Sequence, residues 1–152
     1  MATQEFSLAN AEAFVGRELG VSAWVTMDQQ RIDQFAECTE DHQWIHTDIE
    51  RAKRDSPLGA TIAHGYLTLA LVTVFMSEIF RIDNLTMGIN IGLNRVRFPA
   101  PVTVGSRVRG GAQLISLKPS PAGSLSTVRV TVEAEGQKRA ACIAETLSLY
   151  VA

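Results

Sequence analysis

The densest group of ionisable side chains in the sequence is the stretch Asp41-His42-Gln43-Trp44-Ile45-His46-Thr47-Asp48, which holds two of the three histidines. Asp41 and His46 are five residues apart, so on a continuous helix of ~3.6 residues per turn they would point in different directions. A loop between two helices is therefore expected to bring them together, in a kind of segment where functional residues are common. A carboxylate and an imidazole aimed at one water molecule form a pair suited to general acid–base catalysis.

Two other interpretations of the same stretch stay open. Aspartate and histidine near helix ends often only cap backbone groups. Asp41, His42, His46 and Asp48 also offer metal ligands, although their spacing matches no zinc signature. We expect His42 to be an exposed neighbour rather than a catalytic group.

A second candidate feature is Ile62-Ala63-His64-Gly65, which precedes a strongly apolar segment. The first N–H groups of a helix are unpaired and lie at the positive end of its dipole. Glycine lets a substrate carbonyl approach that backbone closely, as in an oxyanion hole. The alternative is that Gly65 only permits close packing, and we expect His64 to support the loop structurally.

The apolar periodicity predicts three helices in the first half of the chain. Thr26 with Gln29 forms a capping box for a helix that ends near residues 38–40, and Thr47 with Glu50 predicts a short helix over 48–53. No charged residue occurs from Ser56 to Ser77, yet only Tyr66–Met76 is strongly apolar, and a membrane span needs about 20 such residues. A buried core helix from Ala63 or Gly65 to about Phe80 is therefore expected.

Strands are expected around 21–25 and throughout the second half. Apolar residues alternate from Met87, and their parity changes before Val96, which predicts a β-bulge near Asn94–Arg95. Further strands are expected over 108–114, 128–134 and 141–151. Hairpin-connected strands pair antiparallel and need a cover for their apolar face. The predicted fold is α+β, with an antiparallel sheet wrapped around one long central helix.

Length and composition indicate one ordinary domain over residues 1–152. The chain has 14 Lys+Arg and 16 Asp+Glu, a net charge of −2 that gives no electrostatic signature of a nucleic-acid partner. Cys38 and Cys142 form no metal-binding pattern, and each is expected to be a small buried side chain in a reduced, cytoplasmic protein. The polar first ten residues predict no signal peptide, and no membrane partner is expected.

Taken together, these motifs resemble the MaoC-type (R)-specific enoyl-CoA hydratases, which have a hot-dog fold, and in particular the nodulation-protein-N-like branch. The resemblance covers roughly Val15–Tyr150. Its first motif lies at Asp41, Gln43, Trp44, Ile45, His46 and Ala52, its second at Ile62–Gly65, and its third at Val96-Arg97-Phe98 with Pro101-Val102 and Gly105. Gln43 and Trp44 replace an Asn-Pro pair of many hydratases, so the orienting role of that Asn amide must come from Gln43 or from elsewhere.

The resemblance implies reversible addition of water to a trans-2-enoyl thioester, giving an (R)-3-hydroxyacyl thioester. Asp41 and His46 would divide the proton transfers, and the Gly65 N–H would polarise the thioester carbonyl. No metal or redox cofactor is expected, since CoA or an acyl carrier protein enters as part of the substrate. A homodimer is also implied.

Further substrate contacts are expected at Gln43, Trp44, Thr73 and Arg97. Thr73 matches a position where some members carry a serine, although inward packing is its expected role. Among Arg95, Arg97, Arg107 and Arg109, which are suited to CoA phosphates, Arg97 has the best claim because it lies in a motif. Two alternatives remain, a hot-dog acyl-CoA thioesterase and a non-catalytic acyl-binding or dimerising subunit.

Overall fold

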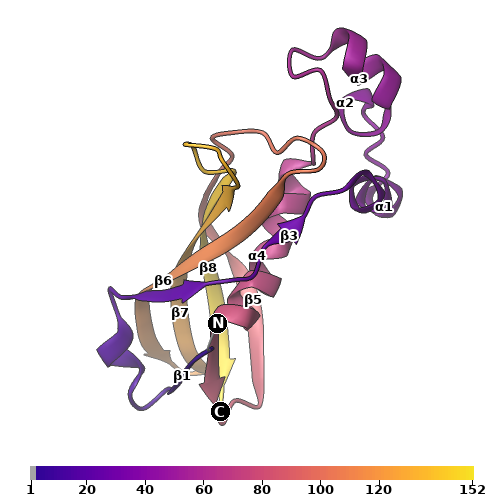
Figure 1. The fold of residues 1–152 in the computed structure, drawn as a ribbon. Coiled ribbons are helices and arrows are strands. Elements are labelled where there is room, and N and C mark those ends of the chain that lie inside the picture. Colours follow the sequence, from indigo (N-terminus) through magenta and orange to yellow (C-terminus); the bar gives the residue numbers. More distant parts are fainter. Residues whose placement is uncertain (1–2) are drawn as a thin grey trace.

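The computed structural model describes residues 3–152, and Figure 1 shows a curved sheet lying against one long helix. No helix in that range is long and apolar enough to cross a membrane. In chain order, the elements are β1 (Gln4–Ser7), the 3-10 helix η1 (Ala11–Phe14), β2 (Glu18–Val21), β3 (Val25–Thr26), α1 (Gln29–Thr39), α2 (Trp44–Thr47), α3 (Ile49–Asp55), α4 (Gly65–Ile79), β4 (Phe80–Asp83), β5 (Met87–Arg97), β6 (Arg107–Ser120), β7 (Gly123–Ala134) and β8 (Cys142–Val151).

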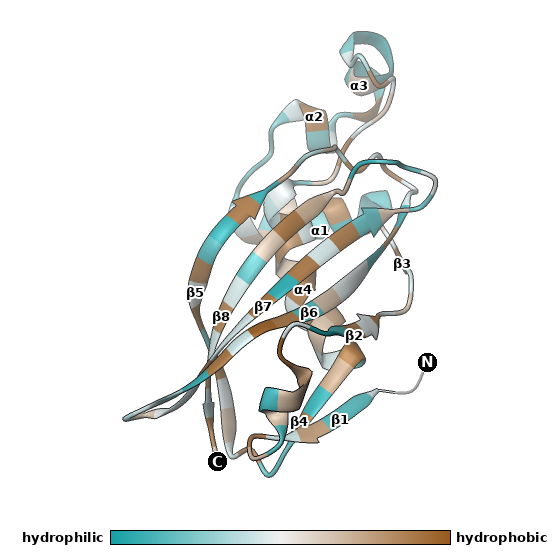
Figure 2. Ribbon diagram, turned by 90° about the vertical axis from the view of Figure 1, so that its left-hand side faces the viewer, coloured by the Kyte–Doolittle hydropathy of each residue, from teal (hydrophilic) through white to brown (hydrophobic). Residues whose placement is uncertain are grey.

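The main sheet has six strands and is antiparallel throughout. Its strand order is β2-β6-β7-β8-β5, and β3 pairs with β6 next to β2. β1 and β4 form a separate parallel pair, and β4 begins directly where α4 ends. The predicted α+β architecture is confirmed, because one antiparallel sheet curves around one central helix (Figure 2).

Helix α4 buries one face against the sheet, but Tyr66, Thr73 and Val74 on its other face are exposed, so the expected burial is confirmed for one face only. Phe75 is fully buried against the sheet, and burying such a side chain stabilises the fold by roughly 1.5–3 kcal/mol. Gly110 on β6 allows this contact, since a Cβ atom at that position would lie 2.7 Å from the Cβ of Phe75. The close approach of α4 to β6 fixes where the N-terminal end of the helix lies.

The two predicted helix starts before α4 are each displaced by one or two residues. The cap of α1 is Asp28, whose carboxylate accepts a hydrogen bond from Arg31 N at 2.9 Å, so the capping box of Thr26 and Gln29 is wrong. The cap of α3 is Asp48 rather than Thr47. Aspartate is among the strongest capping residues and competes with a nearby threonine for the same role.

The strand predictions are confirmed in part. The register of β5 on β8 shifts between Leu93 and Arg95, as expected, and again between Asn90 and Gly92. The strand predicted over 21–25 is divided into β2 and β3. Between them, Ser22 still bonds to β6, since its N–H donates to Gly110 O and its hydroxyl accepts from Gly110 N. Cys142 is buried, and burial raises the pKa of its thiol to about 11. Cys38 lies on the exposed side of α1, so its predicted burial is wrong.

Candidate active site

Asp41 and His46 are brought together by a tight turn between α1 and α2. α1 ends at Glu40 in a left-handed conformation with φ of 62°, and the chain then reverses through Asp41, His42 and Gln43. α2 supplies one helical turn, which places His46 so that Asp41, His46 and His64 each offer a polar atom within 4.8 Å of the others. Asp41 is exposed and His46 is buried, so the pair lies at the boundary between solvent and core.

The hydrogen bond of His46 determines which ring nitrogen is available for chemistry. Its Nδ1 lies 2.7 Å from the carbonyl oxygen of Ile62. A carbonyl can only accept, so Nδ1 carries the proton and Nε2 presents its lone pair. Burial lowers the pKa of His46 below its ordinary value of 6.5, against the opposing effect of the Ile62 hydrogen bond, while the neighbouring His64 lowers it further. His46 is therefore neutral at pH 7 and able to accept a proton.

His64 supports this arrangement, as expected from the sequence. Its ring stacks on that of His46 with the centroids 3.8 Å apart, and its Nε2 donates a hydrogen bond to the Asp41 carbonyl oxygen at 3.0 Å. The Phe35 ring from α1 packs beside it at 4.9 Å. His64 directly precedes α4, so it connects the start of this helix to the turn that carries Asp41.

Gly65 is the first residue of α4, and it lies where the sequence analysis expected an oxyanion site. A Cβ atom at this position would approach the Phe98 ring to 3.2 Å, so only glycine leaves the helix start uncrowded. A cavity of about 320 Å³ opens here, lined by His46, Gly65 and Phe98. Thr68, one turn further along α4, also lines it, and its spacing of three from Gly65 was the signal that could have identified it.

The Asp41 carboxylate and the rings of His46 and His64 are poorly arranged to bind one metal ion, although they lie close together. His46 Nδ1 and His64 Nε2 each donate to a backbone carbonyl, and the stacked rings direct their remaining nitrogens side by side rather than at one point. A ligand nitrogen lies about 2.0–2.1 Å from zinc in the plane of its ring, a geometry that stacked rings do not share. The donor set fits proton transfer better than metal binding.

The other predicted substrate contacts are divided among several places. Gln43 is exposed and precedes α2, and Trp44 is half-buried beneath the Arg51 guanidinium at 4.4 Å. Thr73 is exposed two turns along α4, where its hydroxyl donates to Ala70 O, so the expected inward packing is wrong. It lines a second cavity of about 480 Å³ with Met76, Asn90 and Tyr150, separate from the cavity at Gly65.

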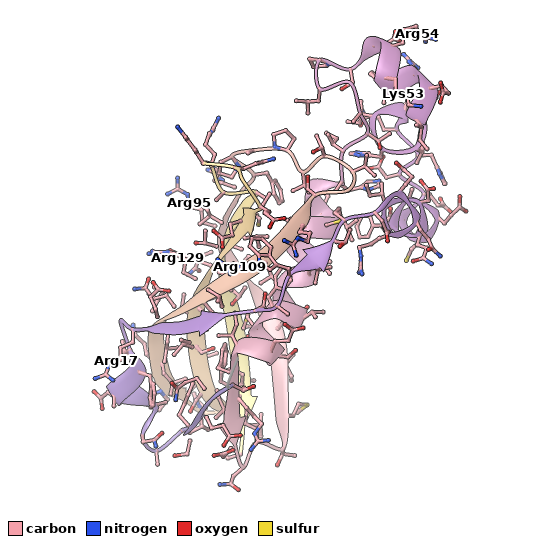
Figure 3. The ribbon with its side chains drawn as sticks, in the orientation of Figure 1. Arg17, Lys53, Arg54, Arg95, Arg109 and Arg129 are labelled. Atoms are coloured by element: carbon pink, nitrogen blue, oxygen red, sulfur yellow. The ribbon has the colours of Figure 1, made fainter. Side chains whose placement is uncertain are left out.

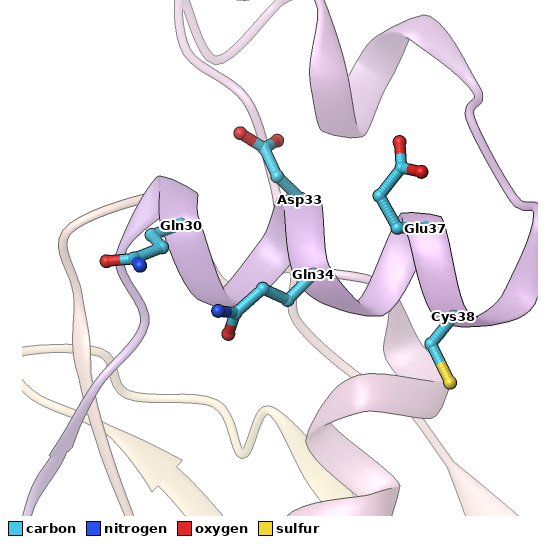
Figure 4. Close-up of a pocket in the computed structure, with 5 residues that line it drawn as sticks. All are labelled: Gln30, Asp33, Gln34, Glu37 and Cys38. Atoms are coloured by element: carbon cyan, nitrogen blue, oxygen red, sulfur yellow. The ribbon is translucent and has the colours of Figure 1, made fainter.

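A wider hollow of about 730 Å³ lies along α1 and includes none of the candidate site residues. In Figure 4 the carboxylates of Asp33 and Glu37 point to one side of the helix and the Cys38 thiol to the other. These side chains do not converge on a common point, so this hollow offers no arrangement for catalysis.

Two relatives are similar to this chain along nearly its whole length. It is 46% identical over 147 residues to the 3-hydroxyacyl-thioester dehydratase Z of Mycobacterium tuberculosis (strain ATCC 25618 / H37Rv), a match covering 96% of this chain and 97% of the relative. It is 48% identical over 147 residues to nodulation protein N of Rhizobium leguminosarum bv. viciae, a match covering 95% of this chain and 91% of the relative.

Solved structures match the fold along most of the chain. The (R)-hydratase from A. caviae superposes with a TM-score of 0.72 at 20% identity, over 89% of this chain and 95% of that one. The MaoC-like dehydratase from Rhodospirillum rubrum superposes with a TM-score of 0.72 at 21% identity, over 91% of this chain and 93% of that one. The sheet and helix are therefore those of a hot-dog fold. Since residues 10–138 match the MaoC-like domain model, the chain belongs to the MaoC-like dehydratase family.

Proposed function

We propose that this protein catalyses the reversible (R)-specific hydration of trans-2-enoyl thioesters to (R)-3-hydroxyacyl thioesters. The observation that carries the proposal is the convergence of Asp41 and a neutral His46 near the N-terminal end of α4 at Gly65. The M. tuberculosis relative is named as a dehydratase of 3-hydroxyacyl thioesters, the same reaction in reverse. We place the reaction in fatty-acid metabolism in the cytoplasm.

Asp41, His46 and Gly65 together account for each proton transfer and for the developing charge of the reaction. A water molecule held between the Asp41 carboxylate and His46 Nε2 adds its oxygen to C3 and loses one proton to this pair, while C2 gains a proton from it. The Gly65 N–H would donate to the thioester oxygen as negative charge develops there, which is worth ~10²–10³-fold in comparable sites. Only water and protons are transferred, so we propose that no metal or redox cofactor takes part.

We expect Asp41→Asn and His46→Gln each to lower the hydration rate by ~10²–10⁴-fold, the usual contribution of a positioned acid or base. The rate is measured as loss of absorbance of the conjugated enoyl group in crotonyl-CoA, hexenoyl-CoA, octenoyl-CoA and dodecenoyl-CoA. The matched control is His42→Gln, which removes an exposed imidazole of the same stretch and should leave the rate unchanged.

A thiol reagent in parallel samples separates this reaction from its alternatives. Free CoA released in step with substrate loss would establish a thioesterase instead. Binding of enoyl-CoA without turnover, unchanged in Asp41→Asn, would establish a non-catalytic acyl-binding subunit. Turnover at the wild-type rate in either substituted protein would remove Asp41 or His46 from the mechanism.

The depressed pKa of His46 predicts the acidic side of the pH profile. Hydration needs neutral His46, so kcat/KM should stay high at neutral pH and fall with a midpoint below pH 6.5 as the ring gains a proton. The unfolded chain takes up this proton near 6.5, before the folded protein does, so the free energy of unfolding should also decrease as pH falls from 6.5 to the folded pKa. Initial rates and urea unfolding across the acidic range measure both, and a midpoint above 6.5 would contradict the assignment.

We further propose that Arg95 and Arg97 hold the phosphate groups of a CoA substrate. With Arg129, Ile143 and Glu145 they line a pocket of about 290 Å³ on the face of the sheet away from α4, where Figure 3 shows Arg95 and Arg129 pointing outward. Arg129 is paired with Glu145 at 2.8 Å, and Arg107 and Arg109 with Glu135 and Glu133. Within residues 3–152, Arg95 and Arg97 form no ion pair, so two guanidinium charges remain for an anion.

Substitution of these arginines should therefore affect only substrates that carry phosphate. For Arg95→Ala with Arg97→Ala we expect KM for crotonyl-CoA to rise roughly tenfold, as for a lost charge-assisted contact, with kcat unchanged. KM for crotonyl-pantetheine, which lacks the phosphates, should not change. Arg17→Ala, which removes an exposed arginine that precedes β2 and does not line this pocket, is the control. An equal effect on both substrates would exclude phosphate binding at this pocket.

We also propose that the protein is a homodimer joined along β5. This strand is at the end of the sheet, and among residues 3–152 it pairs with β8 alone. It exposes Met87, Ile89, Ile91 and Leu93. An unprotected apolar edge strand invites pairing with another chain. Tyr66 and Val74 of α4 are also exposed, and they enlarge the apolar surface that is available to a second copy.

Light scattering after gel filtration should therefore give twice the chain mass of 16.5 kDa. Ile89→Lys with Ile91→Lys should give the single chain mass, because the introduced charges would be buried in the interface. Leu125→Lys, a matched change of an exposed leucine on β7, should leave the dimer intact. A wild-type protein that is monomeric at assay concentration would contradict the proposal.

A further inference from the structure

Gln29, the first residue of α1, makes three short hydrogen bonds although it has no part in the proton transfers. Its Oε1 accepts from the Thr61 hydroxyl at 2.6 Å, and its Nε2 donates to the His46 carbonyl oxygen at 2.7 Å and to Asp33 Oδ1 at 2.7 Å. The His46 carbonyl can only accept, so the orientation of the amide is unambiguous. Thr61 is only 1% exposed, so its hydroxyl depends on this partner.

The residues beside Thr61 are bonded to the same turn of helix. Ile62 N donates to Ile45 O at 3.0 Å, and His46 Nδ1 donates to Ile62 O at 2.7 Å. Gln29 adds a further connection between the two segments, because its amide bonds both to the carbonyl of His46 and to the hydroxyl of Thr61, the residue that precedes Ile62. Since Gly65 follows Ile62 by only three residues, the same bonds fix the distance between His46 and the start of α4.

α2 is too short to hold His46 in place by itself. It contains only four residues, and a single helical turn is not stable on its own. Gln43, at its N-terminal cap, makes no side-chain hydrogen bond to the cap, and Asp48 is engaged in capping α3. Among the described residues, the side-chain amide that bonds to the His46 backbone is that of Gln29.

We propose that Gln29 is the positioning residue of the site, holding His46 at a fixed distance from Gly65 by bridging the His46 carbonyl and the Thr61 hydroxyl. The consequence for catalysis rests on the proposed role of His46 as a proton acceptor. Misplacement of a reacting group by about 1 Å costs on the order of 10²-fold in rate, while substrate contacts at Gly65 and on the sheet are unaffected.

The test compares Gln29→Met, which keeps the length of the side chain and removes its hydrogen bonds, with Gln30→Met on the exposed side of the same helix. For Gln29→Met we expect kcat to fall by roughly 10²-fold with KM within about twofold, and Gln30→Met to behave as the wild type. Thr61→Val should lower kcat in the same way, while Thr61→Ser keeps the hydroxyl and should restore it. The double substitution Gln29→Met with Thr61→Val should cost little more than either one, because both break one bridge.

A readout independent of activity separates this proposal from the proposed function. The ring signals of His46 in NMR spectra should shift, and titrate at a different pH, in Gln29→Met and Thr61→Val but not in Gln30→Met or Thr61→Ser. Absence of turnover in the wild type together with these shifts would overturn the function and leave the bridge standing. Unchanged His46 signals and unchanged kcat in a folded Gln29→Met or Thr61→Val protein would overturn the bridge.

Discussion

The site depends on the pairing of two segments that are far from rigid on their own, the turn of helix around His46 and the extended residues 61–62. Two backbone-directed hydrogen bonds, from Ile62 N to Ile45 O and from His46 Nδ1 to Ile62 O, join them directly. The second of these bonds also selects the tautomer of the imidazole, because the proton that Nδ1 donates to a carbonyl is not available at Nε2. One contact therefore sets the place of the ring and its chemical state, as long as the neighbouring chain holds Ile62 still.

That support comes from α4 and the sheet. The core forms where Phe75 and its neighbours meet β6, far from the chemistry, and the first turn of α4 projects from this packed region to the turn that carries Asp41. The buried face of α4 has little freedom to slide on the sheet, because every displacement creates cavities or clashes in a close-packed interior. The N-terminal end of α4 thus has the rigidity of the core although it lies at the edge of a cavity, which suits a donor aimed at a developing charge.

The sequence was sufficient for the architecture, for the bulge near Leu93–Arg95 and for the grouping of Asp41, His46 and Gly65, because strong periodicity and one compact motif specify them. It was insufficient where several residues of similar type compete for one task. Asp28 takes the helix cap that Thr26 and Gln29 were expected to share. Thr73 is exposed rather than packed inward, because the position of a side chain around a helix depends on how the helix is rotated. The bond between Gln29 and Thr61 spans 32 residues, and no local pattern indicates a pair so far apart.

Burial and the stacked ring of His64 together determine the electrostatic character of His46. Burial is the main reason that the pKa of His46 is lowered, and the second imidazole at 3.8 Å adds to it, because a positive charge on one ring is disfavoured beside the other. The Asp41 carboxylate acts in the opposite direction, yet it lies on the exposed side, where water weakens its influence. The environment therefore keeps His46 neutral beside the Asp41 carboxylate. Such a pair can take a proton from water and deliver a proton to C2 of the substrate.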